Sequence, residues 1–113
     1  GNYEFIGRKD NQVKVYGNRI ELDDVDAALY SLSYVNEAAT IAVSDNDTAG
    51  NLLVTFVNLK LSKLETDVKN DLGKILPSYM VPRRIVAGNF LPRTNTGKID
   101  RVKLKEEYVT GKN

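Results

Sequence analysis

The sequence predicts a small α+β domain in which two to three helices pack on a short sheet, preceded by a two-stranded hairpin. Three observations predict this class. Apolar and polar residues alternate in short segments, apolar residues recur at helical spacing in other segments, and Gly, Asn, Asp and Pro separate the segments. The 113 residues are enough for one packed core but too few for a core and a deep, enclosed active site.

Two short strands are expected near the beginning of the chain, at 3–8 and 12–16, with a turn at 9–11. In the second segment Val13 and Val15 alternate with polar residues, which is typical of a half-buried strand. These two segments therefore predict the hairpin that leads the domain.

A first helix is expected after Gly17-Asn18, a turn signal in which both residues tolerate a positive φ. Either Asp23 or Asp24 is a suitable cap for this helix. Its apolar residues fall on one face, namely Val25, Ala28, Leu29 and Leu32. Two strands are expected next, at 38–43 and 52–59, joined by a hairpin loop rich in Asp, Asn and Gly.

A second helix is expected to open with the capping box Ser62-x-x-Glu65 and to stop at Pro77. Its apolar residues recur at helical spacing, namely Leu64, Val68, Leu72, Ile75 and Leu76. The next segment, 84–87, can add a strand to the sheet.

The last third of the chain combines a loop with a short helix. The segment 91–98 has no periodicity and is expected to be a loop, either ordered or mobile. Asp100 then caps a final helix with Leu104 and Tyr108 on one side.

Composition restricts the chemistry that the domain can perform. The chain has no cysteine and no histidine, which excludes disulfides, thiolate nucleophiles, Ser/His pairs and most zinc sites. Catalysis must therefore use Lys, Arg, Asp, Glu, Tyr or a backbone dipole. No apolar run approaches the roughly 18–20 residues that span a bilayer, so we expect no membrane partner. The absence of cysteine permits a cytoplasmic location, which we expect.

Charge is unevenly distributed although the net charge is only +1. From Arg83 onward there are eight Lys or Arg residues against three acidic residues, which suits an anionic ligand but is also typical of a solvated helix. Nucleic-acid binding is a third interpretation. Tyr108 is the only aromatic residue within 98–113, and because basic and aromatic residues are not interleaved there we expect no nucleic-acid partner.

The loop Thr96-Gly97-Lys98 is one candidate site. A lysine after a glycine suits a cation that must reach a phosphate or carboxylate, because glycine frees the backbone and ammonium is a strong donor. The phosphate-binding pattern G-x-x-x-x-G-K-[ST] does not fit, because Pro92 occupies the first glycine position and Ile99 follows Lys98. Taken alone, Gly-Lys is more often a surface lysine in a turn.

The segment 7–22 is a second candidate. Its alternation places Lys14 on the polar face of the hairpin, and Arg19 and Glu21 can pair on one face of an extended segment. The plain alternative is a solvated face with an exposed ion pair contributing less than about 1 kcal/mol.

Three sequence patterns, which occur in a fixed order along the chain, favour a functional role for both candidate sites over the plain surface alternatives. They are Gly7-Arg8-x-Asp10-x-Gln12-Val13-Lys14-x-x-Gly17-x-Arg19-Ile20-Glu21-Leu22, Leu76-Pro77-x-Tyr79-Met80-Val81-Pro82 and Asn95-x-Gly97-Lys98-Ile99-Asp100-Arg101. Together they resemble the last three core motifs of amino-acid-activating adenylation domains, found in nonribosomal peptide synthetases and D-alanine–carrier protein ligases. The resemblance covers essentially the whole chain. It implies that residues 1–113 are a single C-terminal lid subdomain, excised from a parent whose large N-terminal domain is absent.

The resemblance also implies roles for individual residues. Lys98 matches the catalytic lysine that bridges the substrate carboxylate and the adenylate oxygens. Arg8 matches a nucleotide contact, and Asp10 matches the hinge about which the lid rotates between two half-reactions. A polar turn residue suits a hinge because it can absorb a large change in φ and ψ.

A further set matches the face that lines the pantetheine tunnel during thioester formation. Its members are Lys14, Gly17, Asn18, Arg19, Ile20 and Glu21. The chain departs from the family pattern at Asp23-Asp24, which replaces a common Gly-Glu pair, and Asn18 lies at a variable position.

The implied activity is that of an ATP-dependent ligase, which forms an acyl-adenylate and transfers the acyl group to a carrier-protein pantetheine thiol. ATP with Mg²⁺ would be bound mainly by the absent N-terminal domain, and no metal site is expected in this chain. The expected partners are that domain and an acyl or peptidyl carrier protein, and we expect the fragment to be monomeric and inactive alone. The alternative is a non-catalytic module that docks a carrier protein. The acyl substrate is not implied.

Overall fold

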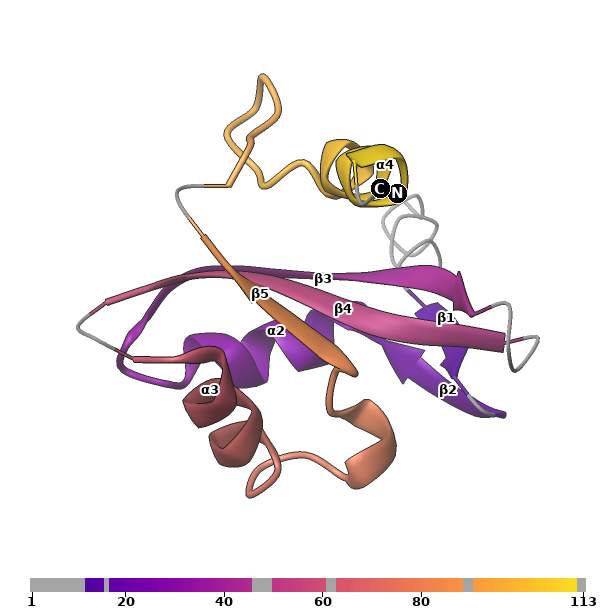
Figure 1. Cartoon of the computed structure of the whole chain (residues 1–113), viewed down its shortest axis with the longest axis vertical. Coiled ribbons are helices and arrows are strands. Elements are labelled where there is room, and N and C mark those ends of the chain that lie inside the picture. Colours follow the sequence, from indigo (N-terminus) through magenta and orange to yellow (C-terminus); the bar gives the residue numbers. More distant parts are fainter. Residues whose placement is uncertain (1–11, 16, 46–49, 61–62, 89–90, 112–113) are drawn as a thin grey trace, which may run out of the picture.

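The computed structural model describes residues 12–15, 17–45, 50–60, 63–88 and 91–111. Along the chain these form β1 (Gln12–Val15), β2 (Asn18–Glu21), α2 (Leu22–Tyr30), β3 (Val35–Asp45), β4 (Gly50–Leu59), α3 (Glu65–Leu72), the 3₁₀-helix η1 (Ser78–Met80), β5 (Arg84–Ala87) and α4 (Arg101–Gly111). The architecture is α+β, with a two-stranded hairpin, a three-stranded sheet and three α-helices (Figure 1). None of the helices in these ranges has the length and apolar composition needed to cross a membrane.

The three-stranded sheet has the order β3-β4-β5. β3 and β4 form a long antiparallel pair, and β5 lies parallel to β4. A parallel pair needs a long crossover connection, and here α3 and η1 supply it. The strands expected at 38–43 and 52–59 are confirmed and are longer than expected, and the strand expected at 84–87 is confirmed.

Apolar side chains on both faces of the sheet are buried. One face packs on α2, α3 and the β1–β2 hairpin, with Leu29, Leu53 and Val68 among its buried residues. The other face packs on α4 and the segment that precedes it, where Leu91 and Leu104 are buried. Figure 1 shows these layers, with α2 and α3 on one side of the sheet and α4 on the other. The sheet therefore carries two surfaces with different coverings.

The hairpin pairs β1 with β2 through a turn at Gly17, whose φ is +84°. The first strand expected from the sequence, 3–8, and its turn at 9–11 lie outside the described residues. The pairing of β1 with Asn18–Glu21 differs from the expectation, in which Gly17-Asn18 is a turn before the first helix. The side-chain amide of Asn51 on β4 donates to the backbone carbonyl of Lys14 at 3.1 Å and ties the hairpin to the sheet.

Two of the three expected helix caps are wrong. α2 follows β2 directly, so its N-cap is Glu21, while Asp23 and Asp24 lie in the first turn, where the helix dipole favours negative charge. α3 begins at Glu65 with Leu64 as its N-cap, and the Leu64 N–H donates to the Asp67 carboxylate at 2.9 Å.

The expected cap of α4 is confirmed. The Asp100 carboxylate accepts a hydrogen bond from the Lys103 N–H at 3.0 Å. Leu104 is buried, and the Tyr108 ring meets Phe56 of β4 edge-to-face with 6.0 Å between centroids. These contacts hold α4 on the sheet face opposite to α2 and α3.

Candidate functional site

Lys98 lies on a small hydrogen-bonded hairpin formed by residues 92–100, here called the Lys98 hairpin. The Thr94 N–H donates to the Lys98 carbonyl at 2.7 Å, and the Gly97 N–H donates back to the Thr94 carbonyl at 3.0 Å. Arg93 and Ile99 face each other as an antiparallel bridge. The segment that lacked periodicity in the sequence is therefore a loop with a defined backbone pattern.

Gly97 sets the turn of this hairpin. Its φ is +89°, a region that costs an L-residue roughly 1–2 kcal/mol. A Cβ built at Gly97 would meet no atom within 4 Å, so the backbone conformation and not the available space requires glycine here. The glycine before Lys98 therefore shapes the turn that presents the lysine.

The side chain of Lys98 is exposed. It is absent from the ion pairs formed among the residues that the structure describes. An ammonium with no internal partner in this part of the chain is available to anions of another domain or of a substrate. This arrangement suits the role expected for Lys98.

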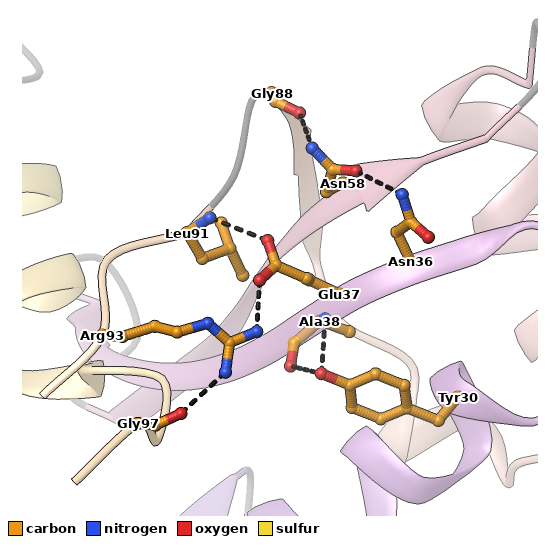
Figure 2. A network of polar contacts seen from close by, with 9 residues as sticks. All are labelled: Tyr30, Asn36, Glu37, Ala38, Asn58, Gly88, Leu91, Arg93 and Gly97. Carbon is orange, nitrogen blue, oxygen red and sulfur yellow. Dashed lines mark hydrogen bonds and ion pairs between the residues drawn. The ribbon is translucent and has the colours of Figure 1, made fainter.

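A buried carboxylate holds the base of the Lys98 hairpin. Glu37 of β3 is only 6% exposed, and its Oε1 accepts a hydrogen bond from the Leu91 N–H at 2.9 Å. Its Oε2 pairs with the guanidinium of Arg93, which also donates to the Gly97 carbonyl at 2.8 Å (Figure 2). Glu37 was not predicted as a site residue from the sequence. The one available indication was a single acidic residue directly before the expected apolar strand at 38–43.

The surroundings of Glu37 favour its ionised form. Burial alone would raise the pKa of Glu37, but the Leu91 N–H and the Arg93 guanidinium outweigh burial and bring the pKa below its ordinary value of 4.5. The carboxylate is therefore charged at neutral pH.

Glu37 predicts a pH dependence of stability. Because its pKa is lowered on folding, its contribution to the free energy of unfolding is complete above pH 4.5 and is lost as the pH falls through the folded-state pKa below that value. Urea unfolding followed between pH 7 and pH 3 should show a smaller loss of stability in Glu37→Gln than in the wild type. Equal losses in the two proteins would contradict this assignment.

The other expected site residues divide between surface and core. Lys14, Asn18 and Arg19 are exposed on the β1–β2 hairpin, Gly17 is exposed at its turn, and Glu21 is half-buried. Ile20 is 1% exposed and belongs to the core, so it supports the hairpin from beneath. Arg8 and Asp10 lie outside the described residues.

The face of the β1–β2 hairpin that carries Lys14 and Arg19 also carries the half-buried Glu21, so both of its exposed charged side chains are basic. Lys14 and Arg19 are directly opposite each other in the register, an arrangement of like charges that is unfavourable without a counter-charge. The suggested Arg19–Glu21 ion pair is not among those that the described residues form. This face therefore suits an anionic partner.

The two candidate surfaces lie on different sides of the domain. The β1–β2 hairpin packs against the sheet face that carries α2 and α3, whereas the Lys98 hairpin is anchored through Leu91 to the face that carries α4 (Figure 1). The structure joins the Lys98 hairpin to Glu37 through Arg93 and Leu91. Among the described residues, Lys98 has no hydrogen bond or ion pair with Lys14 or Arg19.

Comparison with known proteins gives a family match. Residues 24–98 match the model of the AMP-binding enzyme C-terminal domain, and the match ends at Lys98. The chain is 42% identical over 104 residues to gramicidin S synthase 2 of Brevibacillus brevis, covering 92% of this chain and 2% of that protein. It is 41% identical over 109 residues to the D-alanine--D-alanyl carrier protein ligase of Lacticaseibacillus casei, covering 91% of this chain and 22% of the ligase.

Solved structures agree with the fold. An acyl-CoA synthetase of Brucella canis superposes with a TM-score of 0.82 at 30% identity, covering 95% of this chain and 20% of that one. The chain thus spans between a fiftieth and about a fifth of the length of these relatives.

Proposed function

The chain belongs to the AMP-binding enzyme C-terminal domain family, and from this premise we propose that it is the mobile C-terminal part of an amino-acid-activating ligase in which Lys98 promotes adenylate formation. The observation that carries the proposal is the exposed Lys98, which forms no ion pair with the described residues, on a hairpin fixed to the sheet. The relatives named above include a D-alanine--D-alanyl carrier protein ligase, which supports an amino-acid substrate and a carrier-protein acceptor.

In the proposed first half-reaction, a carboxylate oxygen bonds to the α-phosphorus of ATP. The bond from that phosphorus to the oxygen bridging the α- and β-phosphates breaks, and pyrophosphate leaves with the electron pair. The carboxylate and the triphosphate are both anions, so a cation between them offsets their repulsion and stabilises the charge of the transition state. Lys98 supplies this cation, and MgATP is held mainly by the rest of the parent ligase.

In the proposed second half-reaction, a pantetheine thiol attacks the acyl carbonyl carbon, gives up its proton and displaces AMP. The face of the β1–β2 hairpin that carries Lys14 opposite Arg19 suits the phosphate of the pantetheine arm. Because this face and the Lys98 hairpin lie on opposite sides of the sheet, one domain can present them in turn by rotating. Asp10 is the proposed hinge, and Arg8 the proposed nucleotide contact.

This division between faces also explains why the chain alone should be inactive. The described residues supply one surface for each half-reaction, and a surface cannot enclose two reactants. We expect the partners to be the large domain of the parent ligase and a carrier protein, in the cytoplasm.

Complementation tests the proposal. The large domain of the parent ligase, expressed without this domain, should regain amino-acid-dependent exchange of pyrophosphate into ATP when this chain is added in trans. A chain that binds the carrier protein but restores no exchange would instead favour a docking module without chemistry, and would contradict the proposal.

A further inference from the structure

Glu37 uses both carboxylate oxygens on the segment that leads into the Lys98 hairpin. Oε1 accepts from the Leu91 N–H, and Oε2 pairs with Arg93, two residues further along (Figure 2). Leu91 is buried at the same place, so this end of the segment is fixed by apolar packing as well as by polar contacts. A carboxylate that is 6% exposed is costly to bury unless its partners are in place, which makes the arrangement specific.

The backbone of β3 is irregular at this point. The register of β3 with β4 shifts between Val35 and Glu37, which is a β-bulge or similar irregularity. Such irregularities re-aim a side chain relative to a regular strand. In Figure 2 the Glu37 side chain points from the strand toward Leu91 and Arg93.

Arg93 carries the connection across the Lys98 hairpin. One guanidinium nitrogen pairs with Glu37, and the other donates at 2.8 Å to the carbonyl of Gly97, the residue that precedes Lys98. Arg93 also faces Ile99, the residue that follows Lys98, in the antiparallel bridge. A continuous set of polar contacts therefore runs from the central sheet to the peptide group that adjoins Lys98.

We propose that Glu37 and Arg93 are positioning residues, which fix the backbone on both sides of Lys98 so that its ammonium enters the reaction in one geometry. This inference rests on the proposed function of Lys98. In this role the two residues act on the hairpin and not directly on the reactants. Their effect is to prevent the hairpin from shifting relative to the sheet, and a shift of about 1 Å in a catalytic group can lower a rate by 10²-fold.

The alternative is that the pair only stabilises the domain. The two half-reactions separate these roles, because a general loss of stability affects both, whereas a displaced Lys98 affects only the step that uses it. Arg84→Met is a matched control, since Arg84 ties α4 to β5 by donating to the Tyr108 hydroxyl at 2.9 Å and has no contact with the Lys98 hairpin among the described residues.

The experiment uses the full parent ligase with Glu37→Gln, with Arg93→Met and with both changes. Single-turnover adenylate formation should fall by roughly 10- to 100-fold in each single variant. The double variant should lose less than the sum of the two single losses, because the two residues act through one connected set of contacts that meets at their ion pair. Arg93→Lys keeps the charge but cannot make both contacts at once. Its rate of adenylate formation should therefore lie between those of Arg93→Met and the wild type. Thioester formation from supplied acyl-adenylate should be unchanged.

Equal losses in both half-reactions, independent effects of the two changes, or unchanged adenylate formation would each overturn this inference. Lys98→Ala in the same assay keeps the two proposals apart. If Lys98→Ala is slow and the Glu37 and Arg93 variants are not, only the positioning role fails. If Lys98→Ala forms adenylate at the wild-type rate, the proposed function fails.

Discussion

Replacing Lys98 by alanine in the parent ligase is expected to lower the rate of adenylate formation by about 10²- to 10³-fold, the usual effect of removing one preorganised donor from a transition state. The physical reason is that the carboxylate and the α-phosphate would approach each other without a cation between them. Amino-acid-dependent pyrophosphate exchange at saturating substrates measures this rate.

The same change should leave the fold intact, because Lys98 is exposed and has no ion pair with the described residues. We expect the free energy of unfolding of the Lys98→Ala variant to stay within about 0.5 kcal/mol of the wild-type value. Lys105→Ala is the matched control, since Lys105 is an exposed lysine of α4 close in sequence, and its exchange rate should equal that of the wild type. Similar losses in the two variants would show that charge in general, and not Lys98, supports the reaction.

Truncation of Leu29 to alanine should lower the free energy of unfolding by about 2–5 kcal/mol. Leu29 is fully buried, and it lies on α2 within the core that also holds the β1–β2 hairpin. Small domains have a total stability of about 5–15 kcal/mol, so this loss is a large share of the whole. Urea unfolding followed by circular dichroism measures it.

Leu64→Ala supplies the comparison for Leu29, because it removes the same atoms from a side chain that is 64% exposed. We expect a change of no more than about 0.5 kcal/mol there. If the two variants were equally destabilised, the assignment of Leu29 to the core would be wrong.

The strands of the sheet could be predicted from the sequence because each carries its own pattern. Buried Leu53, Val54 and Val57 form one apolar run in β4, and no contact from a distant segment is needed to identify it. The final helix could be predicted for the same reason, since Asp100 caps it through a residue only three positions away.

Caps and strand pairing were harder to predict because they depend on how neighbouring elements join. Glu65 was expected inside a capping box with Ser62, but in the structure its carboxylate accepts the N–H of Ala87, 22 residues away. The pairing partner of β1 was likewise hard to predict, because the segments before and after it, 3–8 and Asn18–Glu21, both had sequences suitable for a strand.

Only part of the candidate site could be predicted from the sequence. Lys98 was identified through its motif, whereas Glu37 and Arg93 are 56 residues apart and meet only because the chain folds back over β3. A single acidic residue in an apolar segment does not reveal its partner. Arg8 and Asp10 lie outside the described residues and remain predictions.

One measurement bears most directly on the role of Lys98: the two half-reactions of the parent ligase, followed separately in single turnovers of the wild type and Lys98→Ala. Adenylate formation should be slower by about 10²- to 10³-fold in the variant, while thioester formation from supplied acyl-adenylate should proceed at the wild-type rate. Equal slowing of both steps, or of neither, would contradict a lysine that acts only while the carboxylate and ATP combine.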